Sequence, residues 1–71
     1  SPVQYITEIR LKIARKLLAT TNDSVVRIAE HVGYPDSFYF SRLFKKHVGM
    51  CPSAYREQIA LAPLQVATYK K

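Results

Sequence analysis

The chain has 71 residues, a formal net charge of +6 at pH 7 and a sequence pI near 9.8. A chain of this length forms one domain and buries only about 60% of its unfolded surface, so we expect modest stability. No apolar run approaches the ~20 residues that span a bilayer, and no signal-peptide pattern opens the chain. The positive charge therefore indicates an anionic partner, DNA ahead of a membrane surface, and a cytoplasmic protein.

The composition also argues against a metal site and against catalysis. Cys51 is the only cysteine, which excludes an intramolecular disulfide and suits a reducing compartment. With His31 and His47 it supplies at most three soft ligands, at a spacing that fits no zinc pattern. No residue pattern resembles a nucleophile with its base and orienting partner. We therefore expect no metal, no cofactor and no enzymatic activity.

The first predicted element is one long helix. Ser1 is a candidate N-cap and Pro2 suits the first helical position. The helix should run to about Leu18 or Ala19, because residues 20–23 form a polar break. Its apolar residues cover more than half of the helical wheel, which is wider than a helix on a single core needs. They are Val3, Tyr5, Ile6, Ile9, Leu11, Ile13, Ala14, Leu17 and Leu18.

Such a wide apolar arc predicts that this helix contacts two bodies. We expect part of the arc to lack cover and to favour self-association of the chain, the candidate residues being Val3, Ile6, Leu11, Ala14 and Leu18. Arg10 lies inside the same arc. A buried or half-buried arginine normally needs a carboxylate or a carbonyl partner. We interpret Arg10 as structural, with its partner unknown, in preference to a DNA contact.

The most informative segment follows, over residues 24–49. Four apolar residues at helical spacing form the inner stripe of a predicted helix, namely Val25, Ile28, Ala29 and Val32. Its opposite face carries Arg27, Glu30 and His31. Gly33 suits the left-handed conformation that ends a helix. The dipeptide Tyr34-Pro35 then forms a turn, and Asp36 is a good N-cap for a second helix that starts at Ser37.

The second helix, over about residues 37–48, has an inner and an outer arc. The inner arc contains Phe40, Leu43, Phe44 and His47, with Tyr39 at its edge; we expect His47 to be a packed or edge residue and not a ligand or base. The outer arc contains Ser37, Phe38, Ser41, Arg42, Lys45 and Lys46. This arc has three cations and no carboxylate, and it is either a solvated surface or a binding face. Phe38 favours a binding face, because a base edge, a thymine methyl group or a sugar would cover its ring.

The basic residues cluster along the chain. Residues 9–22 contain Arg10, Lys12, Arg15 and Lys16 without an acid, and residues 37–56 contain Arg42, Lys45, Lys46 and Arg56 without an acid. After the second helix, a short helix opened by Pro52 should end near Ala62, ahead of Pro63. Residues 63–71 show no convincing period, and we expect this tail to be poorly ordered.

The motif residues closely resemble the AraC/XylS family of bacterial transcription regulators. The resemblance covers residues 1 to about 58 without a gap. It is carried by Arg10-Leu11, Ala14, Leu17-Leu18, Ser24, Ile28-Ala29, Val32-Gly33-Tyr34, Asp36, Tyr39-Phe40-Ser41-Arg42, Phe44-Lys45-Lys46, Gly49, Pro52 and Tyr55-Arg56. Two departures are small: Cys51 stands where Ser or Thr is usual, and Pro35 lies in the turn.

The resemblance implies an all-α fold in which a long linker helix joins two helix-turn-helix subdomains. Residues 1–22 would be the linker helix, residues 23–62 the second helix-turn-helix subdomain with a homeodomain-like three-helix arrangement, and residues 63–71 a C-terminal tail. The first subdomain has no counterpart in these residues. The implied function is sequence-specific binding of duplex DNA in a transcription regulator, such as an activator, in the bacterial cytoplasm and nucleoid.

The resemblance also implies which residues meet the DNA. The face that enters the major groove maps onto Ser37, Phe38, Ser41, Arg42 and Lys45. Arg42 is the best candidate for contact with guanine O6 and N7, and Lys45 and Lys46 are candidates for phosphate contact. An alternative is a protein-interaction module that contacts RNA polymerase or another acidic partner and only grips the DNA backbone. In that module the basic helix would meet the acidic partner. Arg27, Glu30 and His31 are candidates for polymerase contact, although plain solvent exposure is the preferred interpretation of these three. A basic amphipathic peptide at a membrane surface is a further alternative.

Overall fold

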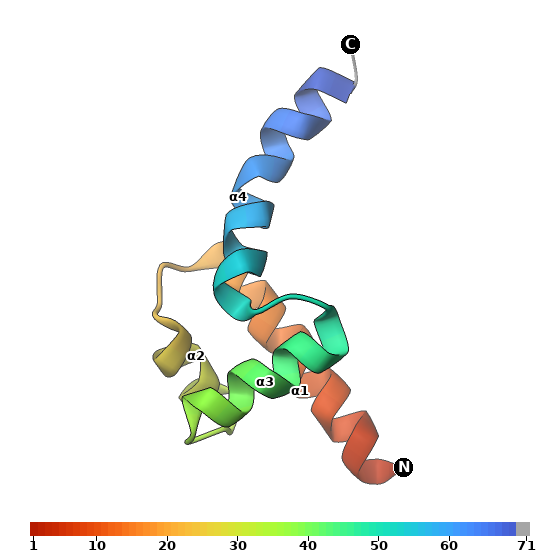
Figure 1. The fold of residues 1–71 in the computed structure, drawn as a ribbon, viewed down its shortest axis with the longest axis vertical. Helices are drawn as coiled ribbons and strands as arrows, with labels where there is room; N and C mark the ends of the chain where they lie inside the picture. The colour runs from red at the N-terminus through yellow and green to blue at the C-terminus, as the bar shows by residue number, and fades with distance from the viewer. Residues whose placement is uncertain (70–71) are drawn as a thin grey trace.

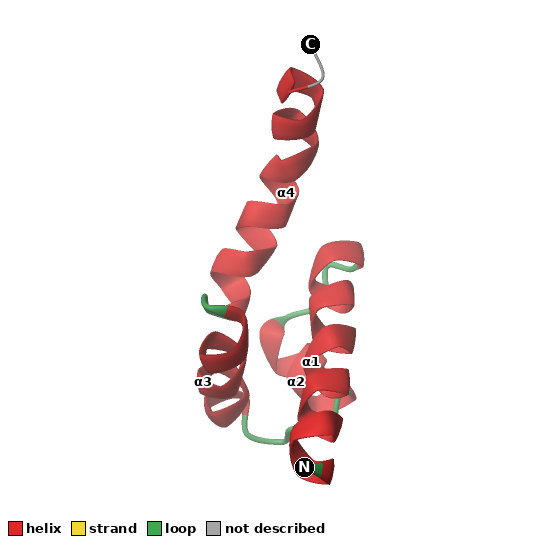
Figure 2. Ribbon diagram, turned by 90° about the vertical axis from the view of Figure 1, so that its right-hand side faces the viewer, coloured by secondary structure: helices red, strands yellow, loops and turns green. Residues whose placement is uncertain are grey.

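The computed structural model describes the backbone of residues 1–69 and the side chains of residues 1–61. Residues 1–69 form four helices and no strand, which confirms the all-α prediction: α1 (Pro2–Thr20), α2 (Val25–His31), α3 (Ser37–Val48) and α4 (Pro52–Tyr69). α3 crosses α1, and α4 continues past the end of α1 so that its last turns project from the other helices (Figures 1 and 2). Helices α2 and α3 with the turn between them form the predicted helix-turn-helix.

The helix boundaries follow from local capping. The Ser1 hydroxyl accepts a hydrogen bond from the Gln4 amide at 3.3 Å, and the Gln4 side chain accepts one from the Ser1 amino group at 3.2 Å. The Ser24 hydroxyl accepts from the Arg27 amide at 3.1 Å and starts α2. Such caps satisfy amides that have no partner within the helix. The predicted start of α1 and the break before α2 are confirmed.

The core lies where the apolar stripes of α1, α2 and α3 meet. Its buried residues are Leu11, Ala14, Leu18, Ile28, Ala29, Val32, Phe40 and Phe44. Phe40 and Phe44 are completely buried, with their ring centroids 5.8 Å apart. Phe44 also contacts Tyr55 edge-on at 5.7 Å, which joins α4 to this core. The predicted inner faces of both motif helices are therefore confirmed, and their packing leaves the opposite face of α3 free.

The outer face of α1 shows which of the candidate residues lack cover. Leu11, Ala14 and Leu18 are buried in the core that α1 shares with α2 and α3. Val3 and Ile6 are exposed, and three more apolar side chains are exposed beside them. We call this set the α1 apolar face: Val3, Tyr5, Ile6, Ile9 and Ile13.

The last helix is longer than expected. We expected it to end near Ala62 ahead of Pro63, with an irregular tail, but α4 runs through Pro63 to Tyr69. A proline in a helix removes one amide and its hydrogen bond to the carbonyl of Ile59, at a cost of about 3 kcal/mol. Its fixed φ is nevertheless helical, and the neighbouring alanines and leucines are strong helix formers. Residues 70 and 71 of the expected tail lie outside the described residues.

Candidate nucleic-acid interface

Helix α3 is held firmly at both ends. The Asp36 carboxylate accepts hydrogen bonds from the amides of Phe38 at 2.9 Å and Tyr39 at 3.3 Å, as an N-cap should. At the other end Gly49 has φ +100° and donates its amide to the Lys45 carbonyl at 2.8 Å. The left-handed backbone conformation at the end of a helix favours glycine, because glycine has no Cβ atom. The two caps define a rigid helix of 12 residues.

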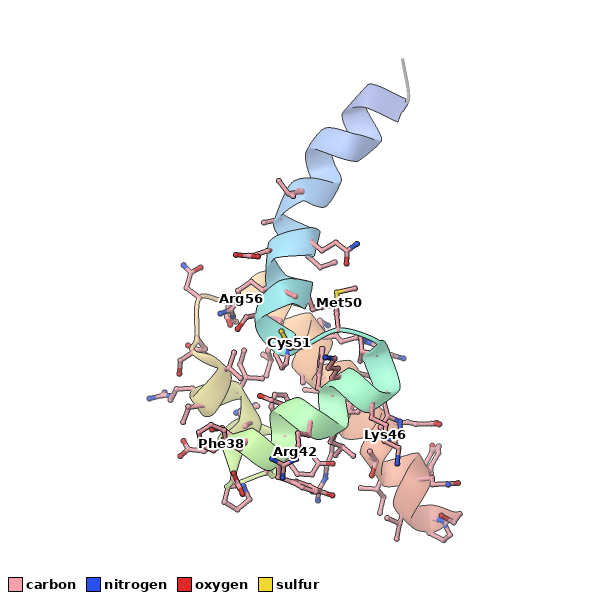
Figure 3. The ribbon with its side chains drawn as sticks, in the orientation of Figure 1. Phe38, Arg42, Lys46, Met50, Cys51 and Arg56 are labelled. Atoms are coloured by element: carbon pink, nitrogen blue, oxygen red, sulfur yellow. The ribbon has the colours of Figure 1, made fainter. Side chains whose placement is uncertain are left out.

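The exposed side of α3 carries the residues predicted to contact DNA. Phe38, Arg42 and Lys46 are spaced four residues apart and lie in one row along the helix (Figure 3). A second row, beside the first, contains Ser37, Ser41 and Lys45. The side chains of Arg42, Lys45 and Lys46 are exposed, whereas Ser37 and Ser41 are half-buried. The structure therefore brings all six predicted residues together on one helix.

The cross-section of α3 suits a DNA groove. An α-helix with its side chains is about 10–12 Å in diameter. The major groove of B-DNA is about 12 Å wide and admits one α-helix. Phe38 is 77% exposed, although it is among the most apolar side chains of the helix. An isolated apolar ring between polar neighbours is a feature that a bound base or sugar would cover.

The turn before α3 is fixed by Gly33 and Tyr34. Gly33 has φ +100°, which confirms the predicted left-handed residue, and the Tyr34 amide donates to the Ala29 carbonyl at 2.8 Å. The Tyr34 ring packs against Tyr39 and Phe40, with centroid distances of 6.0 and 5.9 Å. These contacts tie the turn to both motif helices, so that α2 and α3 keep one relative orientation.

Arg10 has a structural contact, with a partner other than the usual one. Its guanidinium carbon lies 5.4 Å from the centroid of the Tyr34 ring, over the ring face. The usual partner of a half-buried arginine is a carboxylate or a carbonyl. The face of an aromatic ring also attracts a cation, and Tyr34 carries no sequence signal of this pairing.

Arg56 is the cation whose role the sequence did not reveal. It was counted among the basic residues that indicate an anionic partner. In the structure it is half-buried, and it donates hydrogen bonds to the carbonyls of Leu18 and Thr21, both at 3.1 Å. These carbonyls belong to the end of α1, where the helix leaves acceptors unsatisfied and favours positive charge. No local pattern signals a contact between residues 35 or more positions apart.

His47 is an edge residue. It lies on the inner arc of α3 but is exposed, and with Val48 it borders a groove between α3 and α1 that has a volume of about 380 Å³. The α1 side of the groove is lined by Glu8, Leu11, Lys12 and Arg15. The prediction was a packed or an edge histidine, and the structure shows an edge histidine with an exposed side chain.

Two general findings concern the described part of the chain. Among its side chains, no group of three His, Cys, Asp or Glu residues is placed to hold a metal ion. None of the helices within residues 1–69 combines the length and the apolarity needed to cross a membrane. Cys51 is a free, exposed thiol beside the start of α4 (Figure 3).

Comparison with known proteins gives a family and several relatives. A family model described as a helix-turn-helix domain matches residues 1–58. The chain is 44% identical over 59 residues to the MmsAB operon regulatory protein of Pseudomonas aeruginosa, covering 83% of the chain and 19% of that protein. It is 48% identical over 61 residues to the raffinose operon transcriptional regulatory protein RafR of Pediococcus pentosaceus, covering 86% and 22%.

A third relative is the HTH-type transcriptional activator RhaR of Mannheimia succiniciproducens, which is 44% identical over 55 residues, with 78% of the chain and 20% of that protein covered. The chain thus spans about a fifth of the length of the curated relatives that it matches. No solved structure matches the chain. The matched region contains α1, the helix-turn-helix and the first turns of α4. It therefore includes α3 with its exposed face and the helices that pack against α3.

Proposed function

The chain belongs to the AraC-type helix-turn-helix family of transcription regulators, and we propose that it binds duplex DNA by placing α3 in the major groove. The single observation that carries the proposal is the division of α3 into two faces. Phe40 and Phe44 are completely buried on one side, while Phe38, Arg42 and Lys46 form an exposed row on the other. The exposed row carries two cations and one aromatic ring, and no other part of the described chain covers it.

The roles of the individual residues follow from their chemistry. Arg42 stands in the middle of the row, and its planar guanidinium suits a bidentate contact with O6 and N7 of guanine. Lys45 and Lys46 are point charges toward the end of α3, which suits contact with phosphates. Phe38 is placed to cover a thymine methyl group or a sugar. Ser37 and Ser41 are short and half-buried, so they would reach only groups that lie directly against the helix.

We further propose that the chain is the linker helix and second helix-turn-helix subdomain of a longer bacterial regulator that acts at the nucleoid. The length of the matched relatives supports this, since each is about five times longer than the matched segment. The exposed residues Arg27, Glu30 and His31 on α2 would then be free to contact RNA polymerase while α3 is bound to DNA.

The test compares Arg42→Ala with Lys46→Ala in the longer regulator, on a site selected from random DNA and on a scrambled duplex. If Arg42 reads a base, its loss should cost about 1–3 kcal/mol on the selected site and less on scrambled DNA. Loss of Lys46 should weaken both about equally and reduce the salt dependence by about one phosphate contact. Arg27→Ala, an exposed arginine of α2, is the control and should leave both affinities unchanged.

Equal effects of the Arg42 and Lys46 variants on both duplexes would show that α3 only grips the backbone. That result would favour the alternative, in which the chain is a protein-interaction module with non-specific DNA affinity. Absence of any effect from either variant would contradict the use of α3 altogether.

A further inference from the structure

One contact of the linker helix has no part in the proposed DNA-binding face, although it lies directly behind it. Arg10 of α1 is half-buried, and its guanidinium lies over the Tyr34 ring with 5.4 Å between the guanidinium carbon and the ring centroid. The same ring packs against Tyr39 and Phe40 in the first turn of α3. Tyr34 is therefore the piece of the turn through which α1 contacts the start of α3.

Gly33 shows how close this contact is. A Cβ atom on Gly33 would lie 2.9 Å from Nη1 of Arg10 and 3.1 Å from its Cζ, so the guanidinium, the far end of a flexible side chain, would have to shift on the Tyr34 ring to admit it. The residue also has φ +100°, which favours glycine on its own. Two features therefore favour glycine at position 33: the left-handed backbone of the turn, and the Arg10 guanidinium that occupies the space of a Cβ atom.

The turn sets the position of α3. Gly33 and Tyr34 are followed by Pro35 and by Asp36, whose carboxylate caps the helix at the amides of Phe38 and Tyr39. Phe38 is thus four residues from a ring that α1 holds in place. If the Tyr34 ring could move, the exposed row of α3 could tilt relative to α1. The apparent affinity for DNA would then fall in proportion to the fraction of molecules that hold α3 in the binding-competent orientation.

We propose that Arg10 is a positioning residue for DNA binding, which holds the turn through the Tyr34 ring and the Gly33 backbone and does not itself contact DNA. The inference rests on the proposed function, because it assigns to Arg10 an effect on α3. The contact needs a planar guanidinium that stacks on a ring, so lysine is a poor substitute although it keeps the charge.

The experiment measures binding of the 71-residue chain to a random-sequence duplex at low salt, below the melting temperature of every variant. Arg10→Lys should weaken binding by about 5- to 30-fold, the range that the loss of a partly buried cation–π contact allows. Arg10→Met, which also removes the charge, should leave the slope of log affinity against log salt unchanged, because Arg10 neutralises no phosphate. Arg27→Lys, the same exchange on an exposed arginine, should change neither quantity. Tyr34→Phe keeps the ring face and should retain affinity, whereas Tyr34→Leu should behave like Arg10→Lys.

A thermal-unfolding cycle tests the contact without DNA. Gly33→Ala should lower the melting temperature of the unmodified chain, through backbone strain and through the collision with Arg10. In the Arg10→Lys background the decrease should be smaller, because the guanidinium stacking that the new methyl group disturbs is already lost. Additive effects would show that the two residues do not share this contact.

Two further results would overturn the inference. Arg10→Met removes the charge, and a salt slope that falls by about one in this variant would mean that Arg10 contacts a phosphate. An Arg10→Lys variant that melts earlier but binds as tightly as Arg27→Lys would mean that the residue only stabilises the fold. If Arg42→Ala still weakens binding in that case, the proposed function stands and only the positioning role fails; if the unmodified chain does not bind DNA, both fail.

Discussion

Replacement of the half-buried Arg56 by methionine should destabilise the chain measurably. The guanidinium donates two hydrogen bonds, to the carbonyls of Leu18 and Thr21, both at 3.1 Å. A hydrogen bond from a charged group contributes about 1.5–3 kcal/mol, so two at the low end contribute about 3 kcal/mol. Because Arg56 is only half-buried and water screens its charge, we reduce this to about 2 kcal/mol in total. A domain of this size has a free energy of unfolding of about 4–11 kcal/mol, so the loss is a substantial fraction of it.

At about 4–8 °C per kcal/mol, the expected decrease in melting temperature is about 8–16 °C. Circular dichroism at 222 nm during heating measures it, with Arg27→Met as the matched control and an expected change within about 0.5 kcal/mol. Arg56→Lys should fall between the two, because an ammonium keeps the charge at the end of α1 but lacks the fork that reaches two carbonyls. A melting temperature for Arg56→Met equal to that of the control would refute the assignment of Arg56 to the α1 carbonyls.

Two more predictions concern binding and association. The chain alone should bind DNA weakly and with little specificity, with a log–log salt slope near −3, because α3 offers about three phosphate-neutralising cations; nanomolar, salt-insensitive and sequence-specific binding by the monomer would contradict this. The chain should also self-associate at millimolar concentration through the α1 apolar face, because covering a few hundred Å² of apolar surface at roughly 25 cal/mol/Å² contributes several kcal/mol before association entropy. Sedimentation should show dimers that Ile6→Lys abolishes, and a clean monomer in the unmodified chain would exclude the association.

The parts of the fold that were predictable depend on short-range signals. Ser1, Asp36 and Gly33 act through backbone groups within a few residues, so their caps and the left-handed turn can be inferred from residue type and position. The inner face of α3 was also predictable, because helical periodicity alone places Phe40 beside Phe44. The six candidate DNA contacts share a face for the same reason, and their arrangement in two rows follows from their spacing on one helix.

The features that were missed involve residues far apart in the sequence. Arg56 meets Leu18 across 38 positions, and Arg10 meets Tyr34 across the whole of α2. Neither pair belongs to a repeating pattern, and an arginine looks the same in a sequence whether it binds a phosphate, a carbonyl or a ring. The length of α4 was missed because Pro63 was weighed as a terminator, whereas a single proline only weakens a helix whose neighbours favour it.

These two arginines change what the net charge of +6 means for function. Both belong to the clusters of basic residues that indicated an anionic partner, yet one lies on an aromatic ring and the other donates to backbone carbonyls. Their charges act inside the fold and are not free to neutralise phosphates. What remains on α3 is Arg42, Lys45 and Lys46, all exposed and all on the same side. The structure thus divides the basic residues of one short chain into those that hold α1 against the helix-turn-helix and those that face outward from it, and the salt dependence of binding should count only the second group.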